Sequence, residues 1–366
     1  MSKNKKDAAP KSWVDFAVEN FKEIGTKPFS DVNVFLNGTW ASLNVPTFDL
    51  EMEFLGFPKG IIEIRGESMS GKTSLAYQVL ANAVEVHGEN CSSMIFSAEN
   101  RDNRQLADGM RMDVSKVPVS YPKNTEELQN SIIKMVEEGS KWWKESGREG
   151  KQKFVFVLDS MSQLFSSSEA KKIADNADKN DDKAQNPGAS AKANNSMLRA
   201  VKVLSQDHDL TLLVINRTYD KIGFMQRGKV SAGGTGITYL PNVRIELRRV
   251  TDIKGSGSDT RAIGQEVEVT IIKNDFGAPR HKFIIDLMFG YGYTLSSSCI
   301  KFGLERGLLE KYSYGFKSTI PGIDVGWKNK GELIDLLRSG DQAFWDLTTR
   351  ITEEAHTVVM EKRGLA

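Results

Sequence analysis

From about residue 55 onward, the chain alternates between short apolar runs and segments with apolar side chains at helical spacing. The runs at 154–158 and 210–215 are almost wholly apolar, which is typical of central strands covered on both faces. Residues 60–65 and 93–97 are also strand-like, and 125–143 carry their apolar side chains on one side of a helix. This alternation predicts an α/β fold with a doubly wound, mostly parallel central sheet.

The pattern changes in two places. Beyond residue 240, the segments 243–250, 266–273 and 282–287 are strand-like without an intervening helix, so they predict an antiparallel extension of the sheet. Residues 169–195 contain Ile173 as their one large aliphatic residue. Such a composition predicts a segment that buries little and is mobile without a ligand.

The two ends of the chain are predicted to differ from its middle. We expect residues 1–11 to be a disordered tail and 12–24 to form a short helix whose apolar stripe needs a partner surface. Residues 293–366 are predicted to form a small C-terminal α(+β) domain, with its clearest helices at 335–347 and 349–361.

Composition narrows the class of protein only a little. The 366 residues are 39% hydrophobic and 27% charged, and the net charge of +1 means that any anion binding must be local. Two separated cysteines, Cys91 and Cys299, and four histidines disfavour a disulfide framework or a metal cluster. The sequence has no apolar run of membrane-spanning length and no signal-peptide pattern, so we expect no membrane partner and a cytoplasmic location.

Residues 66–73 form a complete G-x-x-x-x-G-K-[ST] phosphate loop between a predicted strand and a predicted helix. Its backbone N–H groups and the helix N-terminus are suited to nucleotide phosphates. Lys72 can reach the β- and γ-phosphates and Thr73 can hold Mg²⁺, so the loop predicts binding of ATP and Mg²⁺. The predicted nucleotide-binding residues of this loop are Gly66, Glu67, Ser68, Met69, Ser70, Gly71, Lys72, Thr73 and Ser74.

Polar residues follow three of the predicted strands, where open α/β sheets bind their ligands. Asp159 follows 154–158 and is expected to complete the Mg²⁺ shell. Glu99 follows 93–97; it is either a general base for water or an ordinary strand-end carboxylate. Arg217 follows 210–215 and either senses the γ-phosphate or forms a strand-end ion pair.

A basic loop follows the last of these strands. Residues 217–236 contain four basic residues and one acidic residue, a local net charge of +3. Ile222, Phe224 and Met225 add apolar side chains to it. Basic groups interleaved with apolar groups suit single-stranded nucleic acid, although a solvated loop with one buried anchor is an equal alternative.

Taken in this order, the motifs resemble the RecA-type recombinase family, including its phage (UvsX-type) members, over about residues 35–315. The resemblance implies an ATPase that forms helical filaments on single-stranded DNA and pairs it with homologous duplex DNA, and it leaves room for single-strand-binding and mediator proteins as partners. The matching motifs lie at 66–73, 97–99, 157–160, 213–216, 221–223, 233–234, 243–249, and 273–274 with 278–279.

The resemblance also implies a role for individual residues. Glu99, Lys72, Arg217 and Lys273 would be catalytic, Thr73 and Asp159 would hold Mg²⁺, and Lys273 would reach a neighbouring subunit's γ-phosphate. Tyr239 would lie at the subunit interface with Lys273. The implied DNA contacts are Lys192, Arg199, Lys221, Ile222, Phe224, Arg227, Lys229, Gly233 and Gly234.

Three positions depart from the family pattern. Arg217 stands where bacterial members have Gln, and Asp275 replaces a second lysine that acts in trans. Leu106 stands where an aromatic residue usually stacks on adenine, so either a neighbouring arginine, Arg101 or Arg104, stacks there instead or base selectivity is loose. These departures keep open a nucleotide-switched DNA-binding scaffold with little hydrolysis. A RecA-fold ring helicase is the other alternative.

The resemblance sets the expected domain boundaries. Residues 46–292 are expected to be a RecA-like P-loop ATPase core with DNA loops at about 168–195 and 217–234. An N-terminal tail with a docking or oligomerisation helix would occupy 1–45, and the C-terminal domain 293–366.

Overall fold

The computed structural model describes residues 12–20, 41–99, 104–175, 187–220, 229–232, 234, 236–254, 261–295 and 297–364. Residues 1–38 and 39–366 are two separate compact units. Of the first unit, helix α1 (Trp13–Asn20) is described, which agrees with the predicted helix at 12–24 as far as residue 20. The predicted tail at 1–11 lies outside the described residues.

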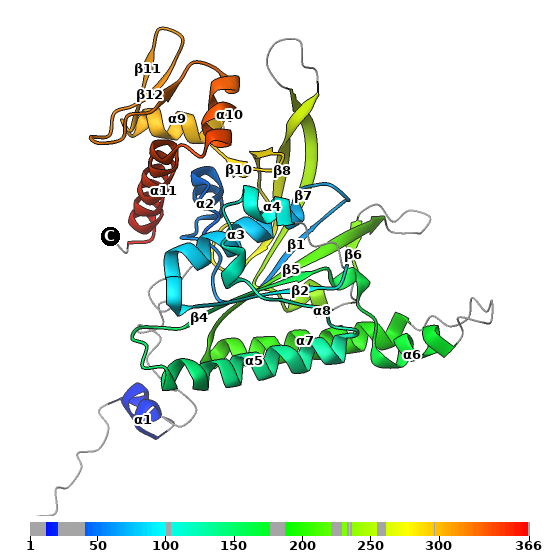
Figure 1. Ribbon diagram of the computed structural model, residues 1–366. Helices are drawn as coiled ribbons and strands as arrows, with labels where there is room; N and C mark the ends of the chain where they lie inside the picture. Colours follow the sequence, from blue (N-terminus) through cyan, green and yellow to red (C-terminus); the bar gives the residue numbers. More distant parts are fainter. Residues whose placement is uncertain are drawn as a thin grey trace, which may run out of the picture. The chain divides into compact units, whose positions relative to one another are not determined.

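A ten-stranded sheet forms the centre of the larger unit (Figure 1). Its order is β10-β9-β8-β7-β1-β5-β4-β2-β3, and β6 pairs with β5 beyond this path. Strands β7 through β3 in this order pair in parallel, whereas β8, β9 and β10 continue the sheet antiparallel. The strands are β1 (Gly60–Gly66), β2 (Cys91–Ser97), β3 (Val119–Ser120), β4 (Lys153–Asp159), β5 (Asp209–Asp220), β6 (Lys229–Ser231), β7 (Val243–Lys254), β8 (Ala262–Asn274), β9 (Lys282–Met288) and β10 (Gly292–Thr294).

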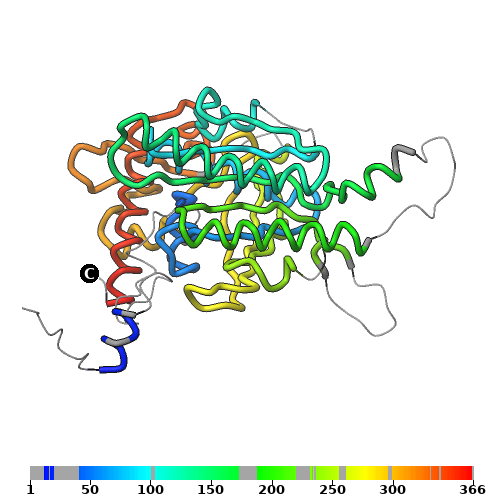
Figure 2. The backbone as a smooth tube through the Cα atoms, turned by 90° about the horizontal axis from the view of Figure 1, so that it is seen from below, coloured from blue at the N-terminus to red at the C-terminus, as the bar shows by residue number. Residues whose placement is uncertain are grey.

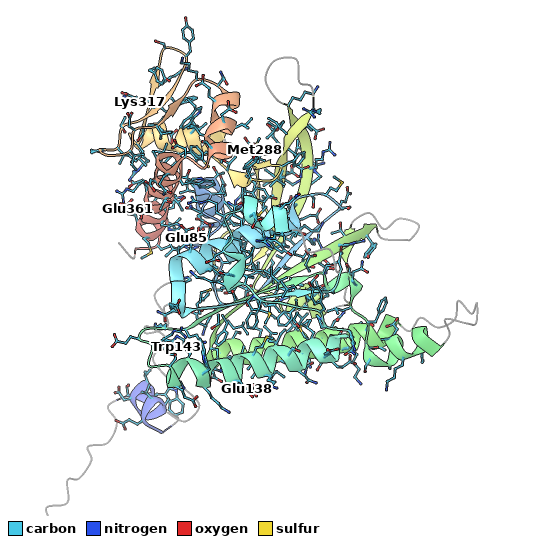
Figure 3. All side chains as sticks on the ribbon, in the orientation of Figure 1. Glu85, Glu138, Trp143, Met288, Lys317 and Glu361 are labelled. Carbon is cyan, nitrogen blue, oxygen red and sulfur yellow. The ribbon has the colours of Figure 1, made fainter. Side chains whose placement is uncertain are left out.

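Helices cover both faces of the sheet. Helices α5 and α7 lie side by side along one face and α3 lies on the other (Figures 1 and 2), and α5 carries Glu138 and Trp143 in Figure 3. The helices of this part are α2 (Pro46–Met52), α3 (Lys72–His87), α4 (Arg104–Gly109), α5 (Thr125–Glu145), α6 (Ser167–Asp175), α7 (Pro187–Asp207) and α8 (Gly236–Tyr239).

The C-terminal part adds a small sheet and three helices. Its strands β11 (Leu309–Tyr312), β12 (Gly315–Ser318) and β13 (Gly326–Trp327) are antiparallel. Its helices are α9 (Ser297–Glu305), α10 (Lys330–Ser339) and α11 (Gln342–Lys362). The predicted fold class, a mostly parallel core with an antiparallel extension and a small α(+β) C-terminal part, is therefore confirmed.

Strand side chains divide the core into two layers. On β1, Ile62 and Ile64 pack in the layer with α3, whereas Ile61 belongs to the layer with α5 and α7. On β4, Val155 packs in the layer with α3, and Phe156 packs in the layer with α5 and α7. Successive side chains of a strand point to opposite faces, so a strand buried on both faces must be apolar throughout.

The C-terminal helices begin and end at other residues than the pattern predicts. The expected helices at 335–347 and 349–361 are wrong in their bounds, because α10 ends at Ser339 and α11 runs through residue 348. Gly340 has φ 67° and its N–H caps carbonyls of α10. The Asp341 carboxylate then accepts from the Phe344 N–H at 2.9 Å and starts α11.

The prediction that 169–195 buries little is wrong at both ends of the segment. Helix α6 includes its start, and α7 begins at Pro187, a favoured residue for the first helical turn. Glu169 and Asn194 are only 4% and 2% exposed. Their burial is possible because Ser190 donates to Glu169, and Thr125 Oγ1 donates to Asn194 Oδ1 at 3.0 Å. Residues 176–186 lie outside the described part.

Strand β5 extends beyond the predicted 210–215 into the expected DNA loop. It reaches Asp220 and pairs antiparallel with β6, with Thr218 opposite Ser231 and Asp220 opposite Lys229. The base of the loop is therefore a two-stranded ribbon. In the part of the chain that is described, no helix combines the length and apolar character needed to cross a bilayer.

Candidate nucleotide site

The phosphate loop leaves the central strand β1 and enters α3, as the sequence predicts. It turns through Gly71, which has φ 92°. A Cβ on Gly71 would lie 2.3 Å from the Tyr293 hydroxyl, so both conformation and space require glycine. Met69 adopts φ 59° and is 80% exposed at the tip of the loop.

Lys72 lies folded against the loop. Its Nζ donates to the Glu67 carbonyl at 2.5 Å and to Ser70 Oγ at 3.4 Å. Burial lowers the pKa of Lys72 from 10.5 to about 8, although nearby Asp159 opposes this shift. An anion in the site would favour the protonated ammonium, so the lysine is suited to phosphate.

Two oxygen groups at the same edge fit a magnesium ion. Thr73 Oγ1 donates to Asp159 Oδ2 at 2.9 Å, which joins the start of α3 to the end of β4. Within the described residues, no group of three or more His, Cys, Asp or Glu side chains could hold a metal. Mg²⁺ commonly takes one or two protein oxygens and completes its shell with phosphates and water, so Thr73 and Asp159 fit it.

Glu99 and Arg217 form an ion pair beside this edge. Arg217 Nη2 lies 2.7 Å from Glu99 Oε1, and Ser160 Oγ donates to the same oxygen at 2.8 Å. The Glu99 side chain is 16% exposed and that of Arg217 is 36% exposed. The pair spans strand β4, which lies between β2 and β5 in the sheet. Both donors therefore compete with any other partner for this Glu99 oxygen.

A buried polar network lies behind Arg217, and sequence reasoning missed it. Glu63 on β1 is fully buried and accepts from Arg244 Nε at 2.6 Å and from Asn216 Nδ2 at 3.0 Å. Asn216 Nδ2 also donates to the Ala232 carbonyl at 2.8 Å, and Asn216 Oδ1 accepts from the Arg217 N–H at 2.9 Å. The charged Glu63 inside the mostly apolar strand β1 was the available signal.

The residues predicted to act across a subunit interface lie together. Lys273 Nζ donates to the carbonyls of Tyr239 at 3.2 Å and Pro241 at 2.7 Å. It also pairs with Asp275 at 3.2 Å, the position where the family pattern has a lysine. Tyr239 is 74% exposed. The role of Lys273 in the site of a neighbouring subunit stays a prediction.

The predicted DNA contacts are described in part. Lys192 and Arg199 are exposed and lie seven residues apart on α7, which places them on one helix face. A Cβ on Gly234 would lie 2.6 Å from Ala191 Cβ, so the end of the second loop packs against the start of α7. Lys229 lies in β6. Its side chain and the predicted contacts Lys221, Ile222, Phe224, Arg227 and Gly233 lie outside the described residues.

The predicted adenine contacts also stay predictions. Arg104 is exposed on α4, with its Nε 3.7 Å from Asp108 Oδ2 one turn along. Leu106 is half-buried and packs against the larger core.

Comparison with known proteins places these features in a family. Residues 14–294 match the family of the RecA N-terminal domain. The chain is similar to "Protein RecA" of Mesomycoplasma hyopneumoniae (strain 7448), with 25% identity over 341 residues, 93% of this chain and 91% of that protein. It is also similar to "Protein RecA" of Sulfurimonas denitrificans, with 27% identity over 275 residues, 73% of this chain and 72% of that protein.

Proposed function

The chain belongs to the RecA family, and from that premise we propose that it is a DNA-dependent ATPase that acts in DNA recombination and repair. It forms filaments on single-stranded DNA and promotes pairing and strand exchange with homologous duplex DNA. We also propose that it is a phage (UvsX-type) member, while the departures at Leu106, Arg217 and Asp275 keep open the scaffold with little hydrolysis. Single-strand-binding and mediator proteins are the further partners that such an activity calls for.

The observation that carries this proposal is the continuity between the nucleotide site and the second loop. Arg217, beside Glu99, and Thr218, in the ribbon at the base of the loop, are successive residues of strand β5. Asn216 contacts both the buried Glu63 and the Ala232 carbonyl at the other end of the loop. A change at Arg217 is therefore transmitted to the loop that is expected to meet DNA.

ATP with Mg²⁺ supplies the transferable phosphoryl group, and the chain positions the water and the charges around it. Lys72 and the loop N–H groups would bind the phosphates, and Thr73 with Asp159 would hold the ion. Glu99 Oε1 orients the attacking water and accepts its proton. In the resting site that oxygen is occupied by Arg217 and Ser160. Attraction of Arg217 to the γ-phosphate would release Glu99 for this work.

The first test is ATP turnover with and without single-stranded DNA. Glu99→Gln keeps a hydrogen-bonding side chain but removes the base, so we expect turnover to fall by roughly 10²-fold while DNA binding persists. Glu89→Gln is the matched control, because Glu89 is exposed and pairs with Arg148 away from the site. Turnover in Glu99→Gln equal to the control would remove Glu99 from the mechanism.

Electron microscopy on single-stranded DNA with a slowly hydrolysed ATP analogue separates the proposal from its alternatives. Helical filaments with DNA-stimulated turnover support the recombinase. Closed rings would favour the RecA-fold helicase, and filaments without turnover would favour the nucleotide-switched scaffold.

A further inference from the structure

The phosphate loop is also held from its outer side, by the antiparallel extension of the sheet. Three of its carbonyls accept from side chains: Glu67 from Lys72, Met69 from Gln265 at 3.0 Å, and Gly71 from Tyr293 at 3.1 Å. Glu67 is held from within the loop. The other two partners come from strands β8 and β10, nearly 200 residues or more away in sequence.

Gln265 and Tyr293 belong to one row of side chains across three strands. Leu287 on β9 pairs with Tyr293 on one side and with Gln265 on the other. Paired residues point to the same face of a sheet, so the row presents one surface. A Cβ on Gly71 would lie 2.3 Å from the Tyr293 hydroxyl and 2.9 Å from Leu287 Cδ2, so this surface is in contact with the loop.

Both polar members of the row are deeply buried. Gln265 is 2% exposed and Tyr293 is 1% exposed. Gln78 on α3 holds the Tyr293 backbone on both sides, accepting from its N–H at 2.6 Å and donating to its carbonyl at 3.0 Å. Burial raises the pKa of the Tyr293 phenol, so the hydroxyl remains a donor at physiological pH.

The two contacts set the direction of two N–H groups in the loop. A trans peptide is planar, so its carbonyl and the N–H of the next residue point in opposite directions. The Met69 carbonyl points outward to Gln265, so the Ser70 N–H points the other way. The Gly71 carbonyl points outward to Tyr293, so the Lys72 N–H also points the other way. The Gly71 carbonyl also accepts from the Leu75 N–H at 3.0 Å, so it is held by two donors.

We propose that Gln265 and Tyr293 are positioning residues for nucleotide binding, which aim the N–H groups of Ser70 and Lys72 at the phosphates. This inference rests on the proposed function only in naming ATP as the ligand. Strand β9 ends at Met288, which Figure 3 labels, and β10 follows after the turn at 289–291 and leads into the C-terminal part. The antiparallel extension thus becomes part of the nucleotide site, although it carries none of the family's phosphate-loop motif.

The test uses Tyr293→Phe and Gln265→Leu in the full chain, with Tyr291→Phe as a control that removes a tyrosine hydroxyl from the turn before β10. Hydrogen exchange of residues 66–75 is measured without nucleotide, and binding of a fluorescent ADP is measured separately. Each of the two variants is expected to speed exchange of the loop amides and to weaken ADP binding by about threefold to tenfold, the effect of one lost hydrogen bond. The KM for ATP is expected to rise more than kcat falls.

Unchanged loop exchange, or unchanged ADP affinity, in both variants would overturn the proposal. A lower melting temperature with normal exchange and affinity would do the same, because it would show a purely structural role. If the wild-type chain binds no nucleotide, the proposed function fails. The exchange measurement then decides by itself whether Gln265 and Tyr293 hold the loop.

Discussion

Single residues at the phosphate site have properties that their neighbours set. Lys72 illustrates this, because burial lowers its pKa to about 8 while the loop still requires a cation for the phosphates. The ion pair between Glu99 and Arg217 is a second case, because each side chain occupies the charged group of the other. In the proposed mechanism, both groups would exchange partners before ATP is cleaved.

The Lys72 pKa predicts a pH dependence of nucleotide binding. Above about pH 8 the free site holds a neutral lysine, so binding a phosphate must take up a proton. Affinity should therefore weaken as pH rises from 8 to 9.5, by at most about tenfold per pH unit. Calorimetry at pH 9 in two buffers of different ionisation enthalpy measures the proton uptake directly.

Lys72→Arg is the matched control for this prediction. An arginine stays protonated in this range, so whatever affinity remains should lose its pH dependence. Equal pH profiles for the two proteins, or no proton uptake at pH 9 in the wild type, would contradict the assignment.

The polar groups of the site could be predicted from sequence only where neighbouring strands bring them together. Asp159 ends β4 and Glu99 follows the end of the paired strand β2, so parallel pairing already places them at one edge. The strand-end ion pair that was one alternative for Arg217 is present, but its partner Glu99 lies across an intervening strand, and no local pattern encodes that choice of partner. The contact of Tyr293 with the phosphate loop could not be predicted, because a tyrosine that follows a turn is ordinary in a strand.

At the scale of elements, apolar runs predicted the central strands well and helix ends poorly. A strand buried on both faces leaves a continuous apolar run, and β4 and β5 both did so. The division between α10 and α11 depends on Gly340 and Asp341, whose effect is local and does not alter the apolar period. Helix α7 begins inside the segment 169–195, whose composition predicted little burial. A hydrogen bond from Thr125 allows its polar Asn194 to be buried.

The cap of α11 gives a prediction about stability. Asp341→Ala removes the acceptor for the Phe344 N–H and should lower the free energy of unfolding by about 1 kcal/mol. Asp341→Asn keeps an acceptor and should remain close to wild type. Denaturant unfolding measures the difference, and faster hydrogen exchange at 342–346 in the alanine variant locates it. Equal stability of the alanine and asparagine variants would show that the cap contributes nothing measurable.

At the scale of the whole molecule, the proposed filament makes Lys273 a residue of its neighbour's site. In the single chain Lys273 is held by the carbonyls of Tyr239 and Pro241 and by Asp275, beside the exposed Tyr239 ring. A role in trans means that the chain is an incomplete enzyme until a second copy binds. Heterologous contacts of this kind generate helical polymers when the rotation between neighbours does not close into a ring.

Mixing two inactive variants tests this arrangement. A filament of Glu99→Gln alone lacks the base, and one of Lys273→Ala alone lacks the trans lysine. In an equal mixture, about a quarter of the sites would combine Glu99 from one subunit with Lys273 from the next. We expect DNA-stimulated ATP turnover to recover toward that fraction, measured against each variant alone. A mixture that is no more active than its components would place Lys273 in its own subunit's site.

Strand β5 has a mechanical consequence of its own. It runs unbroken from Asp209, past Asn216 and Arg217, to Asp220 at the ribbon. At about 3.3 Å per residue, Asp220 lies about 10 Å beyond Arg217. The strand therefore joins the nucleotide edge of the sheet to the two-stranded ribbon without a break. If Arg217 shifted on release of Glu99, the ribbon would be drawn with it, and no hinge would be needed.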